Sequence, residues 1–317
     1  MKLKDFYSFC VQEGIKADLR TKVQLRETFR QQRKKIKVAK TDGRKFFDKE
    51  DLRNPYADTR ILYGDVSKEI KRILVGIDID PAEILLAERL SQKGKVIDLV
   101  LAHHPEGHAW AGFYEVMSLQ TDLLVNLGLE KKVAEDLMSK RIGDVNRRVH
   151  GSNHMRTVDA AKLLDMALMC CHTPADNHVA SYLQNLMETV NPKTLKDAVR
   201  LLMKEPEYQS ASTGKAGPKI VLGKPEDKVG KVFVDMTGGT EGSKDIFARL
   251  SQAGVKTLVC MHLSEEHFKK IQCEYLNVIV AGHIASDNLG MNLLLDKIEK
   301  KSSLEVLECS GFRRFKR

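Results

Sequence analysis

The strongest constraint on the fold is an amphipathic segment flanked by two apolar ones. IKRILVGIDI (residues 70–79) and KVIDLVLA (95–102) have the apolar, β-branched character of buried strands. Between them, the apolar residues of PAEILLAERLSQ (81–92) have the spacing of an amphipathic helix. This order predicts two parallel strands joined by a right-handed crossover.

The same alternation returns near the carboxyl end of the chain. Strands are predicted in KVFVDM (231–236), VKTLVCM (255–261) and LNVIVAG (276–282), and helices in KDIFARLSQAG (244–254), SEEHFKKIQCE (264–274) and DNLGMNLLLDKIEK (287–300). We therefore expect an α/β, two-lobed protein with mixed or parallel sheets flanked by helices and a site in the interlobe cleft.

The expected organisation divides the chain into an extension and a two-lobed domain. Residues 1–55 form a basic helical extension, and residues 56–317 form the domain, with lobes at 56–180 and 181–317. A helical insertion is expected at about 111–165, with helices in SLQTDLLVNLGL (118–129) and KKVAEDLMSK (131–140) and one from Thr157 to about Leu168.

Composition limits the class of protein. No apolar run approaches the roughly 20 residues of a membrane-spanning helix, and MKLKDFYSFC lacks the apolar core of a signal peptide. The six cysteines form no C-x-x-C pair, so mostly buried, reduced thiols are expected in place of a zinc knuckle or a disulfide framework. A cytoplasmic protein with no membrane partner is the resulting expectation.

Positive charge is concentrated at the ends of the chain. The net charge is +9, and residues 1–60 alone hold 17 Lys/Arg against 9 Asp/Glu, while the tail RRFKR adds four cations. A basic arm that binds nucleic acid is one interpretation of residues 1–50. A solvated helix or a subunit-contact extension is favoured over it, because Phe29 is the only aromatic of RTKVQLRETFRQQRKKIKVAK available for base stacking.

Several histidines lie where predicted strands end. His103 and His104 follow 95–102, His262 follows 255–261, and His283 follows 276–282. Ligands of parallel α/β sheets collect beyond the carboxyl ends of the strands, so these side chains stand where sites form. The turn imposed by Pro105 would let both adjacent rings face one cavity, each serving a different metal.

Imidazoles and carboxylates together are typical ligands for zinc, iron, manganese or nickel. His283 precedes Asp287 by four residues, so both can converge as the chain turns into a helix. CCHTPADNH (170–178) adds His172, Asp176 and His178, and a carboxylate such as Asp176 could bridge two cations. Spacing alone leaves a metal site and a structural role equally open.

Three motifs in order resemble the NIF-three-like dinuclear metal-centre family, the GTP cyclohydrolase I type 2 homologues. They are LAHHPEGHA (101–109), HTPADN (172–177) and VIVAGHIASDNLGMNLLLD (278–296), and DTRILYGD (58–65) and DMTGGTEGS (235–243) are compatible with them. The resemblance implies a two-lobed α/β fold, two divalent metal ions in the cleft and a toroidal homohexamer. The ligands it implies are His103, His104, Asp176 as a bridging carboxylate, His283 and Asp287.

This chain departs from the family pattern at one ligand position. The family usually has Glu where this chain has Asp287, and the shorter side chain loses roughly 1 Å of reach, which would weaken one metal site or place a water in it. The helical stretch between the first two motifs and the basic extension are also additions to the pattern. Substrates of relatives are therefore not transferred to this chain.

Other polar residues have two interpretations each. Glu106 and His108 are candidate catalytic, proton-transfer groups or solvent-facing loop residues. His150, His154 and His172 are candidate substrate-binding residues, although the first two also accompany a helix start.

Structural roles are favoured for a further set of polar residues. His262 and His267 flank a helix start, and Asp78 and Asp80 are expected to shape a strand end and cap the next helix. The turn TGGTEGSK (237–244) offers backbone N–H groups for a phosphate, but it lacks the P-loop order, so a tight strand-to-helix turn capped by Thr240 or Ser243 is favoured.

Three functions follow from these features. The first is a metal-dependent hydrolase acting on a small-molecule substrate such as an amidine, cyclic amide or phosphoester, with a bridging hydroxide as nucleophile. The second is a non-enzymatic, ring-forming scaffold that contacts nucleic acid or a protein partner. The third is metal storage or delivery. The sequence selects neither a metal nor a substrate.

Overall fold

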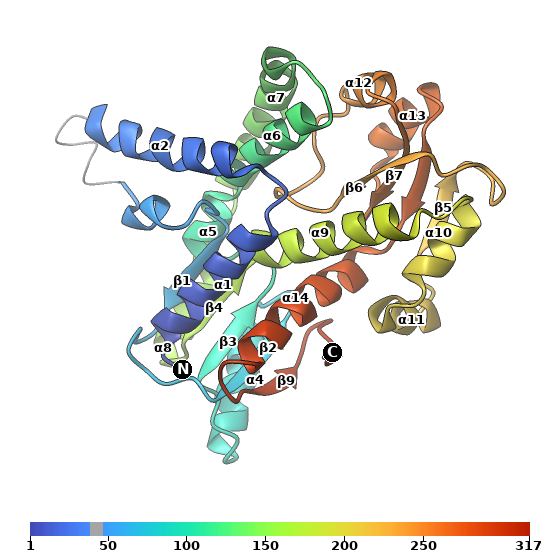
Figure 1. The fold of residues 1–317 in the computed structure, drawn as a ribbon. Helices are drawn as coiled ribbons and strands as arrows, with labels where there is room; N and C mark the ends of the chain where they lie inside the picture. Colours follow the sequence, from blue (N-terminus) through green and yellow to red (C-terminus); the bar gives the residue numbers. More distant parts are fainter. Residues whose placement is uncertain (39–46) are drawn as a thin grey trace.

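The computed structural model describes residues 1–38 and 47–317, which form two mixed β-sheets flanked by helices (Figure 1). The first sheet has the order β1-β4-β3-β2-β9. Its strands are β1 (Thr59–Tyr63), β2 (Arg72–Gly76), β3 (Leu99–Ala102), β4 (Leu168–Cys171) and β9 (Glu305–Glu308). All neighbouring pairs are parallel except β1 with β4, which is antiparallel.

The second sheet has the order β5-β8-β7-β6. Its strands are β5 (Lys219–Leu222), β6 (Lys231–Asp235), β7 (Val255–Cys260) and β8 (Asn277–Val280). The last three are parallel, and β5 is antiparallel to β8 at one edge. The expected α/β class with mixed sheets is therefore confirmed.

The predicted strand-helix-strand units are present. Helix α4 (Pro81–Gln92) connects β2 to β3, and it begins with Pro81 and a capping box in which the Asp80 backbone N–H donates to Glu83 at 2.8 Å. In the second sheet, α12 (Phe247–Gln252) connects β6 to β7, and α13 (Glu265–Cys273) connects β7 to β8. These crossovers bring the carboxyl ends of the parallel strands to one edge of each sheet.

The helix expected to end near Leu168 is wrong in its last part. Helix α8 (Arg156–Leu163) ends earlier, and Leu168–Cys171 form the buried strand β4. A short apolar run has no periodicity that separates a buried strand from the end of a helix. Strand β9 also lies in the first sheet, beside β2, although sequence order places it in the second predicted lobe.

The helical stretch between β3 and β4 joins the first sheet to the second. It contains α5 (Gly107–Ala111), the 3-10 helix η2 (Phe113–Met117), α6 (Ser118–Asn126), α7 (Lys131–His150) and α8. Apolar residues of η2, α6 and α7 pack against one face of the second sheet, in a cluster that contains Met117, Leu124 and Met138 together with Phe233 and Leu258. Burial of this cluster fixes the stretch over the second sheet.

The opposite faces of the sheets are covered by two long helices. Helices α9 (Thr173–Val190) and α14 (His283–Glu299) pack against each other (Figure 1). Residues of α9, α10 (Leu195–Leu202) and α11 (Pro206–Thr213) pack with the second sheet, and Met291 and Leu295 of α14 pack with the first. The two helices thereby connect the cores of both sheets.

The predicted N-terminal extension contains two helices with different surroundings. In α1 (Leu3–Ala17), the side chains of Leu3, Phe6 and Cys10 are buried in the same cluster as the first sheet. In α2 (Lys22–Val38), Leu25 is the only buried residue. The short 3-10 helix η1 (Lys49–Leu52) follows, and residues 39–46 lie outside the described residues. The division at residue 55 and the lobe boundary at residue 180 remain predictions.

Two expectations about composition can be compared with the described residues. None of their helices is long and apolar enough to cross a membrane. All six cysteines are free thiols; four are buried, Cys309 is half-buried and Cys273 is exposed.

Candidate metal centre

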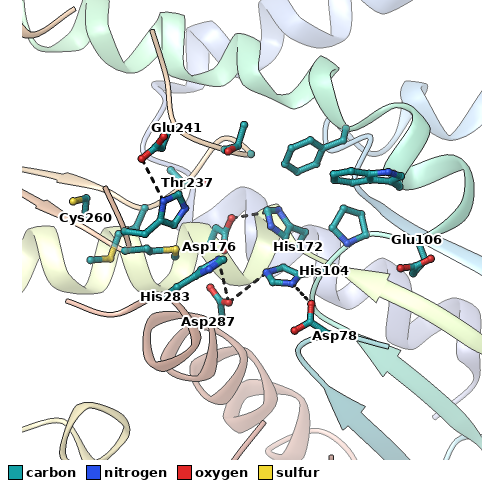
Figure 2. Close-up of a pocket in the computed structure, with 18 of the residues that line it drawn as sticks. Asp78, His104, Glu106, His172, Asp176, Thr237, Glu241, Cys260, His283 and Asp287 are labelled. Atoms are coloured by element: carbon teal, nitrogen blue, oxygen red, sulfur yellow. Dashed lines mark hydrogen bonds and ion pairs between the residues drawn. The ribbon is translucent and has the colours of Figure 1, made fainter. Parts of the chain in front are cut away.

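Histidine and aspartate side chains converge where strands of the first and second sheets end (Figure 2). His103 and His104 follow β3 directly, and Asp176 lies in the first turn of α9, after β4. His283 and Asp287 lie in the first two turns of α14, after β8. The five residues that the family resemblance implies as ligands therefore lie together.

Asp287 faces three imidazoles at once. Its Oδ1 is 3.4 Å from His103 Nε2, and its Oδ2 is 3.5 Å from the Nε2 atoms of both His104 and His283. One oxygen of the carboxylate therefore faces His103, and the other faces His104 and His283. The shorter side chain at this position reaches both groups.

Asp176 completes the deeper of the two groups. Its Oδ1 lies 3.4 Å from His103 Nε2, so the first group able to hold a metal ion is His103, Asp176 and Asp287. The second is His104, His283 and Asp287, and a third, without a carboxylate, is His103, His104 and His172. Asp287 belongs to the first and the second of these groups, and Asp176 also turns its second oxygen, Oδ2, to His172 Nδ1 at 3.4 Å. The bridging role that the family resemblance implies for Asp176 stays a prediction.

The separations between the side chains of the first two groups suit metal coordination better than direct hydrogen bonding. Among the described residues, His103 Nε2, Asp176 Oδ1 and both carboxylate oxygens of Asp287 are buried without a hydrogen-bond partner. Buried polar atoms are nearly always paired. Separations of 3.4–3.5 Å are long for a charge-assisted hydrogen bond. They match two ligands of one tetrahedral ion, which lie roughly 3.3–3.6 Å apart when each is about 2.0–2.2 Å from the metal.

The two carboxylates of the cluster differ in how far nearby imidazoles compensate for their burial. Burial opposes ionisation of Asp287, but His103, His104 and His283 hold its pKa far below the usual range. Burial raises the pKa of Asp176 well above its usual value, and the attraction of His103 does not compensate. A cation in the deeper group would supply the charge that the ionised form of Asp176 lacks.

The pKa values of His104 and His283, the two more exposed histidines of these groups, shift in opposite directions. Burial would lower the pKa of His104, yet its contacts with Asp287 and Asp78 raise it to about 10. Burial lowers the pKa of His283 to about 4, which keeps its imidazole neutral. A neutral imidazole is the form that binds a metal, so His283 is already in the binding form.

Two carboxylates that sequence reasoning did not assign to the site support its histidines. Asp78 accepts from His104 Nδ1 at 2.7 Å, and buried Asp58 lies 3.0 Å from His172 Nδ1. The His172 ring stacks on that of His103 with 4.8 Å between the ring centroids. Carboxylates in this position fix the tautomer and orientation of ligand histidines.

The positions of Asp58 and His172 in the sequence do not indicate that the two side chains meet. The antiparallel pairing of β1 with β4, in which Thr59 faces Cys171, brings them together. Asp80 caps α4 as expected, whereas Asp78 has this contact in addition to its place at the strand end.

The cluster opens into a cleft of about 630 Å³ between the two sheets. Glu106 and His172 line it at one end, and Thr237 and Glu241 line it at the other (Figure 2). Trp110 and Phe113 of the helical stretch and His262 after β7 also line it. Of the candidate catalytic and substrate-binding residues, Glu106 and His172 are therefore in the cleft.

The remaining candidates lie elsewhere among the described residues. His108 lines a separate cavity with Arg60 and Tyr7. His150 is exposed at the end of α7, and His154 Nε2 bonds the Val149 carbonyl at 2.8 Å as the chain turns. His150 and His154 therefore do not line the cleft, although Ser152 and Asn153 between them do.

The turn after β6 is held by a side chain from the helical stretch. Gln120 of α6 donates to the Gly238 and Thr240 carbonyls at 2.8 and 2.7 Å. Gly238 and Gly239 have φ of 85° and 91°, and a Cβ on Gly238 would lie 2.8 Å from Gln120 Cγ. Helix α12 begins only at Phe247, so this turn does not form the helix N-terminus that an anion site would use.

His262 and His267 are both tied to Glu241. The carboxylate lies 3.4 Å from His262 Nδ1 and 3.5 Å from His267 Nδ1, and it accepts from the Ser264 backbone N–H at 2.6 Å. His267 also bonds Ser264 Oγ at the start of α13, in keeping with the structural role expected for it. The ring of His262 packs 4.9 Å from that of His283, which brings the second sheet into contact with the cluster.

Solved structures resemble this chain over most of its length. A NIF3 superfamily protein from Sphaerobacter thermophilus is 30% identical, with a TM-score of 0.68, over 80% of this chain and 91% of that one. HcgD from Methanocaldococcus jannaschii is 16% identical with a TM-score of 0.48, covering 78% and 87% of the two chains. A Bacillus cereus protein related to NIF3 is 14% identical with a TM-score of 0.40, covering 80% and 90%.

No family model and no curated protein matches the sequence. The identity, coverage and fold shared with the Sphaerobacter protein decide the family. The motifs around His103, Asp176 and His283 carried the same resemblance in the sequence alone. This chain belongs to the NIF3 superfamily.

Proposed function

We propose that the cleft holds two divalent cations and that the protein is a metal-dependent hydrolase of a small-molecule substrate. The observation that carries the proposal is the position of Asp287, whose two oxygens face two different histidine groups. One carboxylate shared between two ligand groups is the arrangement of a dinuclear centre.

The donor set limits which metals are proposed. Imidazole nitrogens and carboxylate oxygens suit zinc, iron, manganese and nickel. His103 and Asp176 would hold one ion and His104 and His283 the other, with Asp287 between them. None of these groups includes a thiolate, which would favour softer metals.

When bound, such a pair of cations polarises a scissile bond and makes water a nucleophile at neutral pH. Asp78 and Asp58 would hold the imidazoles of His104 and His172 in fixed tautomers. The neighbouring rings of Trp110 and Phe113 would bind an apolar part of the substrate. Glu106, whose pKa is raised by burial, is the candidate proton donor in the cleft.

The experiment combines metal content with turnover. Purified protein is loaded with zinc, iron, manganese or nickel in turn and assayed on amidines, cyclic amides and phosphoesters. His104→Ala should abolish turnover, and His150→Ala, which changes an exposed histidine outside the cleft, should not. Full turnover of the His104→Ala variant would contradict the proposal.

Bound metal without turnover on any of these substrates would overturn the hydrolase assignment. It would support instead a non-enzymatic metal-binding scaffold or a metal store, and the two differ in how readily the ions exchange.

The proposal includes assembly and location. The family resemblance implies a homohexamer, so light scattering should give a mass about six times the 35.8 kDa of the chain. A cytoplasmic location is proposed from the sequence composition, and fractionation of cells that produce the protein tests it.

A further inference from the structure

Helix α2 carries most of the net charge of the protein. It contains seven Lys/Arg and one acidic residue, Glu27, in 17 residues. Its net charge of +6 is two thirds of the +9 of the whole chain. Charge this concentrated on one exposed element creates a local positive potential that a near-neutral body does not cancel.

Five of these cations share one face of the helix. Lys22, Arg26, Arg30 and Arg33 recur at intervals of four, four and three residues, and Lys34 lies beside them. At about 100° per residue, all five fall within an arc of roughly 120°, and Lys37 falls within the same arc. We call these five residues the basic stripe. Each of them is exposed.

Three apolar residues of α2 lie on a different arc and are at least partly covered, whereas Val23 and Val38 are exposed. Leu25 is buried, and Phe29 and Ile36 are half-buried. In the basic stripe, Arg30 pairs with Glu27 at 2.6 Å. Among the described residues, the side chains of Arg26, Arg33 and Lys34 form no ion pair or hydrogen bond. The stripe is therefore not used to hold the fold together.

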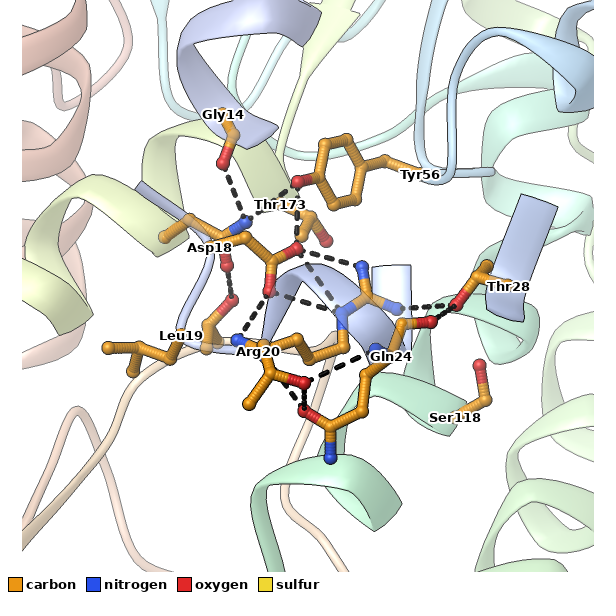
Figure 3. A network of polar contacts seen from close by, with 12 residues as sticks. Gly14, Asp18, Leu19, Arg20, Gln24, Thr28, Tyr56, Ser118 and Thr173 are labelled. Carbon is orange, nitrogen blue, oxygen red and sulfur yellow. Dashed lines mark hydrogen bonds and ion pairs between the residues drawn. The ribbon is translucent and has the colours of Figure 1, made fainter. Parts of the chain in front are cut away.

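The base of α2 is fixed by a buried polar network (Figure 3). Arg20 pairs with Asp18 at 2.8 Å, both side chains being almost fully buried, and it donates to Thr28 Oγ1 in the second turn of α2. Gln24 Nε2 donates to the Asp122 carbonyl of α6 at 3.2 Å. From this base, α2 extends away from the two sheets (Figure 1), so the basic stripe is presented in a defined direction.

The carboxyl-terminal cations differ from the stripe in this respect. Arg314 pairs with Asp296 and Glu299 of α14. Arg317 pairs with Glu205 and Glu207 at 3.0 and 2.7 Å. The basic tail is thus largely neutralised by its own protein, and the positive surface available to a partner is on α2.

We propose that the basic stripe binds the phosphate backbone of double-stranded DNA. Lys22 and Lys34 are separated by about 18 Å along the helix, so the cations can meet several phosphates of one duplex. Arginine forks match phosphate oxygens in pairs, and three of the five cations are arginines. The major groove of B-DNA admits an α-helix, whereas that of duplex RNA is too narrow.

Other partners fit the basic stripe less well. It contains no aromatic residue for the base stacking that single strands require. Val23 and Val38, the exposed apolar residues of α2, lie at opposite ends of the helix and form no continuous apolar face that could insert into a membrane. A second copy of the helix would bring like charges together.

The test is the binding of the full-length protein to a 20-base-pair DNA duplex of mixed sequence, measured by fluorescence anisotropy at several salt concentrations. The variant combines Arg26→Glu, Arg33→Glu and Lys34→Glu. The control combines Lys193→Glu, Lys224→Glu and Lys228→Glu, which make the same change in net charge at exposed positions near β5 and β6. Circular dichroism confirms that both remain folded.

The wild-type log K should fall with log salt with a slope of about −4.5, for five phosphates. The stripe variant should bind at least about a hundredfold more weakly, with a slope shallower by about 2.7, and the control should bind within about threefold of wild type. Equal losses in both variants would overturn the proposal, as would salt-independent binding. Tighter binding to single-stranded DNA, duplex RNA or anionic phosphatidylserine vesicles would overturn it as well.

Discussion

The two ligand groups of the cleft have the same chemistry in different surroundings. The side chain of His103 is 0% exposed, and its partners Asp176 and Asp287 are buried with it. The side chains of His104 and His283 are 26% and 39% exposed. The group of His103 is almost fully buried, with only its carboxylates lining the cleft, whereas the imidazoles of the other group are partly exposed in the cleft.

This difference predicts different roles for the two ions. In the buried group a cation would neutralise carboxylates that are almost fully buried, so its loss leaves uncompensated charge in surroundings of low dielectric constant. In the open group a cation could exchange ligands with solvent or substrate, as catalytic sites with an open position do. We therefore expect the deeper ion to be retained and the outer ion to react.

The largest expected effect comes from removing the residue that both groups share. Asp287→Asn should weaken binding of both ions by more than about a hundredfold, because even outer partners of metal ligands contribute 10–100-fold. Elemental analysis after dialysis should find less than one ion in two chains. Asp136→Asn, an exposed change of the same kind on α7, should keep full metal content. If the Asp287→Asn variant retained both ions, Asp287 would not be the ligand that the two groups share.

Changing each tandem histidine separately should remove one ion each. His104→Ala should lose the outer ion and keep the deeper one, with little change in stability. His103→Ala should lose the deeper ion and also about 1–3 kcal/mol of stability, because it empties a fully buried position. Metal analysis and thermal unfolding of both variants measure the difference. Identical behaviour of the two variants would show that the groups are not distinct.

Chelation should proceed in two phases. With excess chelator, the outer ion should leave at least about tenfold faster than the deeper one, because only its ligand histidines contact solvent. Stopped-flow measurement of the released metal distinguishes the phases. The melting temperature should fall mainly in the slow phase, since a ligand stabilises the folded state by a free energy that increases with the logarithm of its affinity. A single phase would mean that exposure does not control exchange.

The smallest expected effect comes from changing Asp78, a carboxylate that contacts His104 of the outer group. Asp78→Asn removes the carboxylate that bonds His104 Nδ1, and it should weaken the outer ion by about tenfold, the low end for such partners. The deeper ion should be unaffected. Isothermal titration with the outer site emptied gives the affinity, and an equal loss at both sites would show that the groups are coupled more tightly than their geometry indicates.

The local order of strands and helices could be predicted because their periodicities are strong. Helix α4 has the predicted bounds, and β2, β3 and the strands of the second β-α-β set fall within the predicted segments. Strands β1, β5 and β9 were missed because short edge strands of four or five residues lack a distinctive pattern. Their pairing depends on tertiary contacts.

The candidate site could be predicted where its residues follow strands. His103, His104 and His283 stand at carboxyl ends of parallel strands, and the fold brings such ends together. Asp58 could not be found in this way, because it meets His172 only through an antiparallel pairing of distant segments. The position of Asp287 between both groups also depends on how α14 is placed, which spacing does not specify.

The most direct test of the two-group account is the anomalous scattering of crystals grown from metal-loaded protein. A dinuclear centre would give two peaks in the cleft, one beside each oxygen of Asp287, each about 2.0–2.2 Å from its ligand atoms. The peak beside His103 and Asp176 should keep full occupancy after a brief chelator soak, and the peak beside His104 and His283 should weaken. A single peak, or peaks that do not contact Asp287, would contradict it.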